Sequence, residues 1–129
     1  MEKLFSKSWK SSTQRRKQRK YRFQAPLHIK RKFVSMHLSD DLKKKYNKRS
    51  VIARKGDTVK VMRGQFKGKQ GKIETLNTKE SRVILAGIEV VKKDGSKARF
   101  PIHASNLLLV EVIIDDKERV KSLQRKQTP

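Results

Sequence analysis

Three closely spaced glycines constrain the fold of this chain more strongly than any other feature. Gly64, Gly68 and Gly71 follow a segment in which Val59 and Val61 occupy every second position. A period of two is typical of a strand that buries one face. Glycine permits positive φ and a close approach of the backbone to its neighbours. We therefore predict that a tight turn, the glycine loop (residues 62–72), joins two strands here.

Positive charge is concentrated in this loop. Four cations lie between the glycines or directly beside them, and they are Arg63, Lys67, Lys69 and Lys72. Cations and unpaired loop N–H groups both suit the oxygens of a phosphate backbone. An ordinary hairpin with a solvated, lysine-rich turn is the alternative. A nucleotide-binding phosphate loop is excluded, because Phe66 occupies the position where that pattern requires a glycine.

The charge of the chain is high and uneven. The 129 residues contain 35 Lys and Arg against 12 acidic residues, a net charge of +23. Residues 1–55 hold 19 of these cations, only 3 acidic residues and no glycine, whereas all six glycines lie between 56 and 95. Self-repulsion at this charge density indicates a polyanionic partner, with nucleic acid as the first candidate and an anionic membrane surface as the second.

Several classes of protein are disfavoured by what the composition lacks. The chain has no cysteine, and its three histidines have no metal-ligand spacing, so no metal or cofactor is expected. The few acidic residues are explained by helix caps and strands, so no catalytic residue and no enzyme activity are expected. No apolar run approaches the roughly 20 residues that span a bilayer. We expect no membrane insertion, no secretion signal and an intracellular location.

Alternating apolar residues and turn signals predict a run of short strands after residue 50. The predicted segments are 50–53, 58–62, 71–75, 82–85, 88–92, 97–101 and 107–112. Gly87 is expected to break this run, and Asp94-Gly95 is a strong hairpin signal. On the last strand, Leu108 and Val110 are expected to share a face opposite Glu111. Such strands favour a small closed barrel, which leaves no exposed edge.

Helices are predicted on both sides of this strand-rich region. A short helix is expected to open at Ala25-Pro26 and to run to Val34. A second is expected after Ser39 as N-cap, with Asn47 as a C-cap. A C-terminal helix is indicated by acidic residues followed by basic ones, the order that the helix dipole favours. Its charged residues are Asp115, Asp116, Glu118, Arg119 and Lys121.

The segment before residue 25 cannot form a core. No aliphatic residue occurs between Ser11 and Arg22, so the free segment is expected to be disordered or a frayed helix that orders on RNA. The aromatic residues Trp9, Tyr21 and Phe23 are unexpected in so polar a segment. They are predicted to stack on unpaired bases or to contact a partner, whereas for Phe33 and Tyr46 local packing is the alternative.

The glycine loop and its surroundings resemble a KOW motif, and the rest of the chain resembles one family that contains it. The matching features are Gly56-Asp57, the Val-x-Val pair, Gly64, Phe66-Lys67-Gly68 and Gly71-Lys72. Around them, in one order, lie Gln-Ala-Pro-Leu-His at 24–28, Leu38-Ser39 with Leu42, Tyr46 and Arg49-Ser50, then Asp94-Gly95 and Pro101-Ile102-His103-x-Ser105-Asn106. The chain is thus similar to the KOW-containing large-subunit ribosomal proteins, in the archaeal and eukaryotic branch of universal protein twenty-four (eukaryotic protein twenty-six). Ala104 departs from the Pro of many relatives.

This resemblance implies a mainly β fold, with a small SH3-like barrel, a basic and partly helical N-terminal extension and a short C-terminal helix. We expect three units: the arm (residues 1–49), the barrel (50–114) and the C-terminal helix with its tail (115–129). The resemblance implies a structural constituent of the large ribosomal subunit that binds large-subunit rRNA near the peptide exit tunnel and supports early assembly. Neighbouring ribosomal proteins and nascent-chain factors are the implied protein partners, and no homo-oligomer is expected. A transcription factor with a KOW module is the alternative.

The residues predicted to contact RNA are cations and loop glycines of both regions. In the arm they are Arg15, Arg16, Lys17, Arg19, Lys20, Arg22, His28, Lys30, Arg31, Lys32 and Arg49. In the glycine loop they are Arg63, Gly64, Lys67, Gly68, Lys69 and Lys72. Most of them are expected to contact the RNA backbone and not the base edges.

Overall fold

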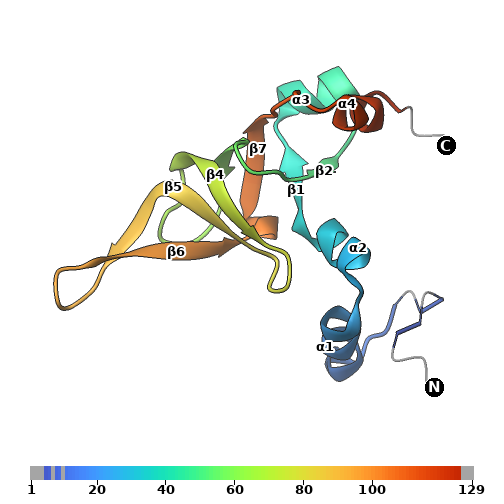
Figure 1. Ribbon diagram of the computed structural model, residues 1–129, viewed down its shortest axis with the longest axis horizontal. Helices are drawn as coiled ribbons and strands as arrows, with labels where there is room; N and C mark the ends of the chain where they lie inside the picture. Colours follow the sequence, from blue (N-terminus) through green and yellow to red (C-terminus); the bar gives the residue numbers. More distant parts are fainter. Residues whose placement is uncertain (1–4, 7, 10, 126–129) are drawn as a thin grey trace.

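The structure is a computed structural model that describes residues 5–125 apart from positions 7 and 10. Its strands are β1 (Ser35–Leu38), β2 (Ser50–Ile52), β3 (Thr58–Val61), β4 (Gln70–Asn77), β5 (Arg82–Val91), β6 (Lys97–His103) and β7 (Leu107–Glu111). Its helices are α1 (Arg15–Gln24), α2 (Leu27–Lys30), α3 (Asp40–Tyr46) and α4 (Lys117–Gln124), with 3-10 turns η1 (Arg31–Val34) and η2 (Ala104–Asn106). The mainly β, barrel-like class, with N-terminal helices and a short C-terminal helix, is confirmed (Figure 1).

The seven strands form one curled sheet in the order β2-β1-β7-β3-β4-β5-β6. Neighbouring strands are antiparallel except β1 and β7, which run parallel. The curled sheet encloses one apolar cluster, to which most strands contribute alternate residues. In β7 the inward face carries Leu107 and Leu109, while Leu108 and Val110 are only partly buried. Leu108 and Val110 thus share a face, as expected, but the alternate face with Leu107 and Leu109 enters the core, a choice that three consecutive leucines leave ambiguous in the sequence.

Two strand predictions need correction. The sequence patterns do not predict β1, although Met36 and Leu38 are buried and the intervening His37 is exposed. Its four residues lie directly after η1, and they pair with both β2 and β7. Gly87 is expected to end a strand, but β5 continues through it, with a positive φ of 79° and an irregular register between Ile84 and Glu89. A glycine within a strand pattern marks a bulge of this kind.

The first helix of the arm, α1, stands away from the sheet. In Figure 1, α1 lies beyond α2 and is separated from the strands. None of its residues is buried. Ser12 helps to start the helix, since its hydroxyl accepts a hydrogen bond from the N–H of Gln14 at 3.2 Å. Among the described residues, no helix has both the length and the apolar character to cross a lipid bilayer.

The predicted caps of α3 are found only in part. Asn47 has the left-handed conformation expected of a C-terminal cap, with φ 49°. Ser39 occupies the N-cap position, but its side chain makes no capping hydrogen bond.

In α4 the N-terminal cap is Asp116, whose side chain accepts a hydrogen bond from the N–H of Glu118 at 2.9 Å. An ion pair with Arg54 and, to a smaller extent, that capping bond lower the pKa of Asp116.

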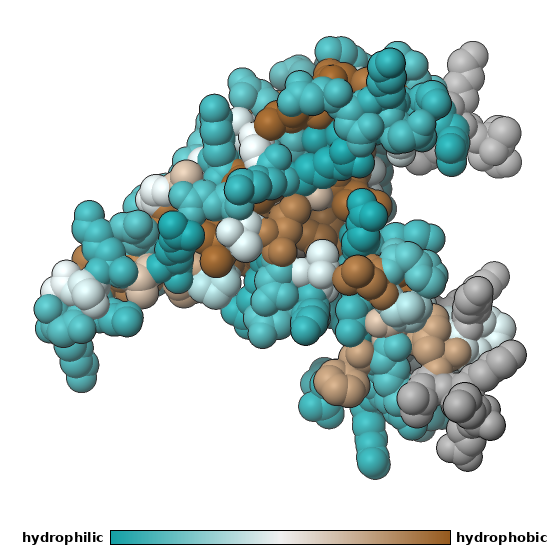
Figure 2. Space-filling model, viewed as in Figure 1, coloured by the Kyte–Doolittle hydropathy of each residue, from teal (hydrophilic) through white to brown (hydrophobic). Residues whose placement is uncertain are grey.

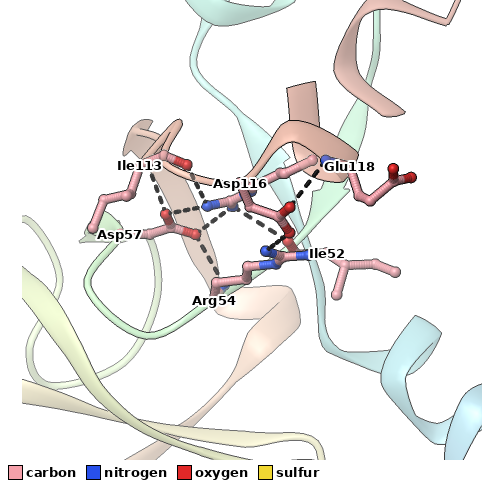
Figure 3. A network of polar contacts seen from close by, with 7 residues as sticks. Ile52, Arg54, Asp57, Ile113, Asp116 and Glu118 are labelled. Carbon is pink, nitrogen blue, oxygen red and sulfur yellow. Dashed lines mark hydrogen bonds and ion pairs between the residues drawn. The ribbon is translucent and has the colours of Figure 1, made fainter. Parts of the chain in front are cut away.

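A buried ion pair attaches α4 to the barrel. Arg119 in α4 donates two hydrogen bonds to the Asp57 carboxylate, at 2.7 and 2.6 Å. Asp57 is 0% exposed and Arg119 5%. The carboxylate also accepts from the N–H groups of Ile113 at 3.0 Å and Arg54 at 2.9 Å (Figure 3). The acidic residue of the Gly56-Asp57 pair thus holds the fold together and does not face a ligand.

We expect Gly71→Ala to destabilise the barrel by about 1–3 kcal/mol through overpacking. A Cβ at Gly71 would lie 2.6 Å from the backbone oxygen of Ala86 in β5, which cannot move aside as a flexible side chain can. The φ of Gly71 is not positive, so alanine at this strand position would otherwise be stabilising. Chemical denaturation measures the change, and Gly71→Ser should lose at least as much. A Gly71→Ala midpoint at or above the wild-type value would contradict this account.

Candidate nucleic-acid interface

The predicted contacts of α1 form an exposed array of cations. All six of them are exposed, and no acidic residue lies in the first turn of the helix. Among the described residues, none of the six forms an ion pair with a carboxylate. The helix therefore displays uncompensated positive charge over its whole length, the electrostatic pattern that a phosphate backbone matches. Figure 2 shows the predominantly hydrophilic surface of this face of the molecule.

The remaining residues of the arm that are predicted to contact RNA differ in the exposure of their side chains. His28, Arg31, Lys32 and Arg49 are exposed. Lys30 is partly buried, and its Nζ donates a hydrogen bond to the backbone oxygen of Phe23 at 3.0 Å. Lys30 therefore ties α2 to the end of α1, so its side chain has a structural contact as well as a charge.

The glycine loop folds on itself between β3 and β4, and its last residues begin β4. Gly64 and Gly68 have positive φ of 95° and 88°. The N–H groups of Lys67, Gly68 and Lys69 bond to the oxygens of Gly64, Val61 and Phe66, respectively, at 3.1, 2.8 and 3.1 Å. These three N–H groups are thus engaged within the protein. What the loop presents to a ligand is mainly its exposed cations, Arg63, Lys67, Lys69 and Lys72.

Phe66 anchors the loop instead of being displayed by it. Its side chain is buried in the core cluster, and its ring centroid lies 5.1 Å from that of Phe100 in β6. The ammonium of Lys69 lies 5.3 Å from the same ring, within the range of a cation–π contact. Because Phe66 anchors the loop, the backbone positions from which its cations extend are set before any partner binds.

A hollow of about 280 Å³ lies beside the loop. Its lining includes Arg63 from the loop, Arg82 from β5 and His103 from the end of β6. The pKa of His103 is lowered by its burial and then by the positive charges of Arg22 and Arg82. The hollow therefore brings a cation of β5 and a cation of the loop together in one region.

Arg82 is a candidate that the sequence patterns did not single out. It is exposed at the start of β5, directly before the buried Val83. The same alternation that predicts an inward Val83 predicts an outward Arg82, so the signal was present, but nothing in the sequence placed β5 beside the glycine loop. His103 accepts a hydrogen bond from the N–H of Ser105 at 3.3 Å, so its neutral ring caps η2. The assignment of the predicted residues to RNA contacts stays a prediction.

Comparison with known proteins shows the family to which this chain belongs. Residues 12–126 match the family described as the eukaryotic ribosomal proteins L26 and their archaeal counterparts of the L24 type. The chain belongs to this family. The match covers the arm helices, the whole sheet and α4, which confirms the recognised resemblance.

Members of this ribosomal family from archaea are similar over almost the whole chain. A protein of Methanosphaera stadtmanae named large ribosomal subunit protein uL24 is 50% identical over 115 residues, which are 89% of this chain and 98% of that protein. Proteins with the same name from Methanocella arvoryzae and Methanothrix thermoacetophila are 43% and 44% identical, over 90% and 88% of this chain and 94% and 98% of their own lengths. The family match therefore rests on most of the sequence and not on the KOW motif alone.

Proposed function

We propose that this chain is a structural constituent of the large ribosomal subunit that binds large-subunit rRNA. The observation that carries the proposal is the match to the ribosomal family over residues 12–126, with archaeal relatives named as large-subunit proteins. The exposed cations of α1 and of the glycine loop support it, since a polyanion is the partner that such charge requires. The role proposed is architectural, with no catalytic step.

The two cationic regions have different parts in this proposal. The glycine loop is anchored by Phe66 and carries its cations on a fixed backbone next to Arg82, which suits recognition of RNA shape. The arm helix has no buried residue, so its contacts with RNA supply the stabilisation that it lacks in the free chain. Of the three proposed units, 1–49, 50–114 and 115–129, the first provides α1 as the RNA-binding helix and also β1, which pairs with strands of the second. In the third, α4 is attached to the sheet through the Asp57–Arg119 ion pair.

The finer parts of the proposal concern location and partners. We place the protein in the cytoplasmic ribosome, near the peptide exit tunnel, with neighbouring ribosomal proteins and nascent-chain factors as partners, and with a role in early subunit assembly. These proposals derive from the family resemblance. They predict that depletion of the chain causes the accumulation of incomplete large-subunit particles.

Sucrose-gradient sedimentation of a native lysate tests the central proposal. After a high-salt wash, the chain should remain with the large subunit, because an integral protein does not dissociate when surface contacts are screened. Release into the light fractions together with binding to RNA polymerase would instead support a transcription factor. A chain found with neither would contradict the ribosomal proposal.

A further inference from the structure

The aromatic residues of the arm divide into a packed group and one free ring. The Tyr21 ring centroid lies 4.9 Å from that of Phe5 and 4.5 Å from that of Trp9. Tyr21 also meets Phe33 of η1 edge-on, at 6.2 Å. These four rings form a small aromatic cluster that holds the start of the arm against α1 and η1. Trp9 and Tyr21, for which a contact with RNA or a partner is predicted, thus pack against other aromatic residues of the chain, as does Phe33.

Phe23 is the ring left out of this cluster. Its side chain is 83% exposed, more than any other large apolar side chain described. Within the described residues it makes no contact with another aromatic ring. A ring so exposed adds little to the packing of the free protein, and both of its faces are accessible to a partner.

The backbone around Phe23 is fixed even though its ring is free. Successive residues of a helix point about 100° apart, so Tyr21 and Arg22 can face η1 while Phe23 faces elsewhere. Arg22 lies with its guanidinium 5.8 Å from the centre of the Phe33 ring. The backbone oxygen of Phe23 accepts the hydrogen bond from Lys30, and Ala25, two residues later, is buried. The ring is therefore presented outward from an anchored helix end.

The charge around Phe23 determines what kind of partner fits it. Arg19 and Lys20 lie four and three residues earlier in α1, on the same side of the helix as Phe23, and both are exposed. An apolar protein surface would have to desolvate these charges without compensation. An RNA strand with an unpaired base offers phosphates to the cations and an aromatic face to the ring.

We propose that Phe23 is a base-stacking site, at which one unpaired rRNA base stacks on the ring while Arg19 and Lys20 bind the adjoining phosphates. This proposal rests on the proposed rRNA binding. It assigns to Phe23 a contact with a base, in addition to the contacts that cations make with the RNA phosphate backbone. Stacking needs a base that is out of a duplex, so the site selects a single-stranded or bulged element of the RNA.

Binding of variants to in vitro transcribed large-subunit rRNA tests the site. Phe23→Ala should weaken binding about 5- to 150-fold, the range found when stacking on one base is lost. The dependence of affinity on salt should not change, because no phosphate contact is removed. Phe23→Trp should retain affinity, whereas Phe23→Leu, which keeps apolar volume without an aromatic face, should lose most of what Phe23→Ala loses. A fully paired RNA duplex should bind wild type and Phe23→Ala equally.

Leu27→Ala is the matched control, because Leu27 is 64% exposed and lies four positions after Phe23. It should bind within about twofold of wild type. Wild-type affinity of Phe23→Ala, or of Phe23→Leu, would overturn the stacking site while leaving rRNA binding in place. Failure of the wild-type chain itself to bind the transcript would overturn the proposed function and, with it, this site.

Discussion

Arg119→Ala is expected to destabilise the protein by about 3–5 kcal/mol, the cost of breaking a buried ion pair by removing one partner. The substitution leaves the Asp57 carboxylate fully buried without the two hydrogen bonds, at 2.7 and 2.6 Å, that balance its charge. It also removes the bond from Arg119 to the backbone oxygen of Ile113 at 2.9 Å, so α4 loses its attachment to the segment after β7. Asp57→Asn should cost a similar amount, because it leaves the arginine uncompensated.

Thermal and chemical unfolding of the single and double variants measure this effect. The loss in Arg119→Ala should lower the melting temperature by on the order of 10–20 °C. The double variant Asp57→Leu with Arg119→Met should recover most of the loss, since it removes both charges together. Lys121→Ala is the control, because Lys121 pairs with Glu118 at 2.9 Å in an exposed setting and should cost less than about 1 kcal/mol. A double variant no more stable than the worse single variant would contradict this role for the pair.

The same ion pair illustrates what local sequence patterns could not predict. Asp57 belongs to a recognisable motif, and Arg119 is a basic residue suited to the end of a helix. Both statements concern neighbours along the chain, whereas the pair joins residues 62 positions apart. Whether a charged residue is buried depends on the tertiary packing around it, and the pattern of charges in α4 is explained equally well by the helix dipole. The role of Asp57 in the fold therefore emerged only from the structure.

The strands were predicted where residue chemistry and period agreed. Thr58–Val61 alternates cleanly, and the Asp94-Gly95 turn lies between β5 and β6 as expected. The strand β1 was missed because Ser35–Leu38 directly follows the helical turn η1, and no glycine or proline in the sequence marks the boundary between them. Gly87 was misjudged because a glycine in a strand can mark either an end or a bulge, and only pairing with a neighbouring strand distinguishes them.

For the candidate interface, the sequence predicted which residues are exposed cations better than it predicted how the fold places them relative to one another. The exposure of the arm and loop cations follows from their charge, and the turn follows from Gly64 and Gly68. Phe66 was counted as a motif residue, but its burial in the core depends on contact with Phe100, 34 positions away. Arg82 was likewise recognised as a possible RNA contact only in the structure, because the folded sheet brings β5 next to the glycine loop.

Replacing all six cations of α1 by glutamine is expected to have the largest effect on RNA binding. The set is Arg15, Arg16, Lys17, Arg19, Lys20 and Arg22. Each phosphate contact contributes about 0.7–0.9 to the slope of log affinity against log salt concentration. If all six cations contact phosphates, the slope should fall in magnitude by about 4–5. Glutamine is a good helix former, and α1 has no buried residue, so the fold of the barrel should be unaffected.

A second variant with the same net charge separates contact from general attraction. It replaces six exposed lysines outside the predicted interface, Lys44, Lys79, Lys92, Lys93, Lys97 and Lys117. Both variants lose the same long-range attraction to RNA, but only the first loses the array on α1. Titrations with large-subunit rRNA at several salt concentrations should therefore give a nearly wild-type slope for the second variant and a much smaller slope for the first. Equal slopes would mean that the RNA responds to the net charge of the protein, and that α1 makes no phosphate contacts of its own.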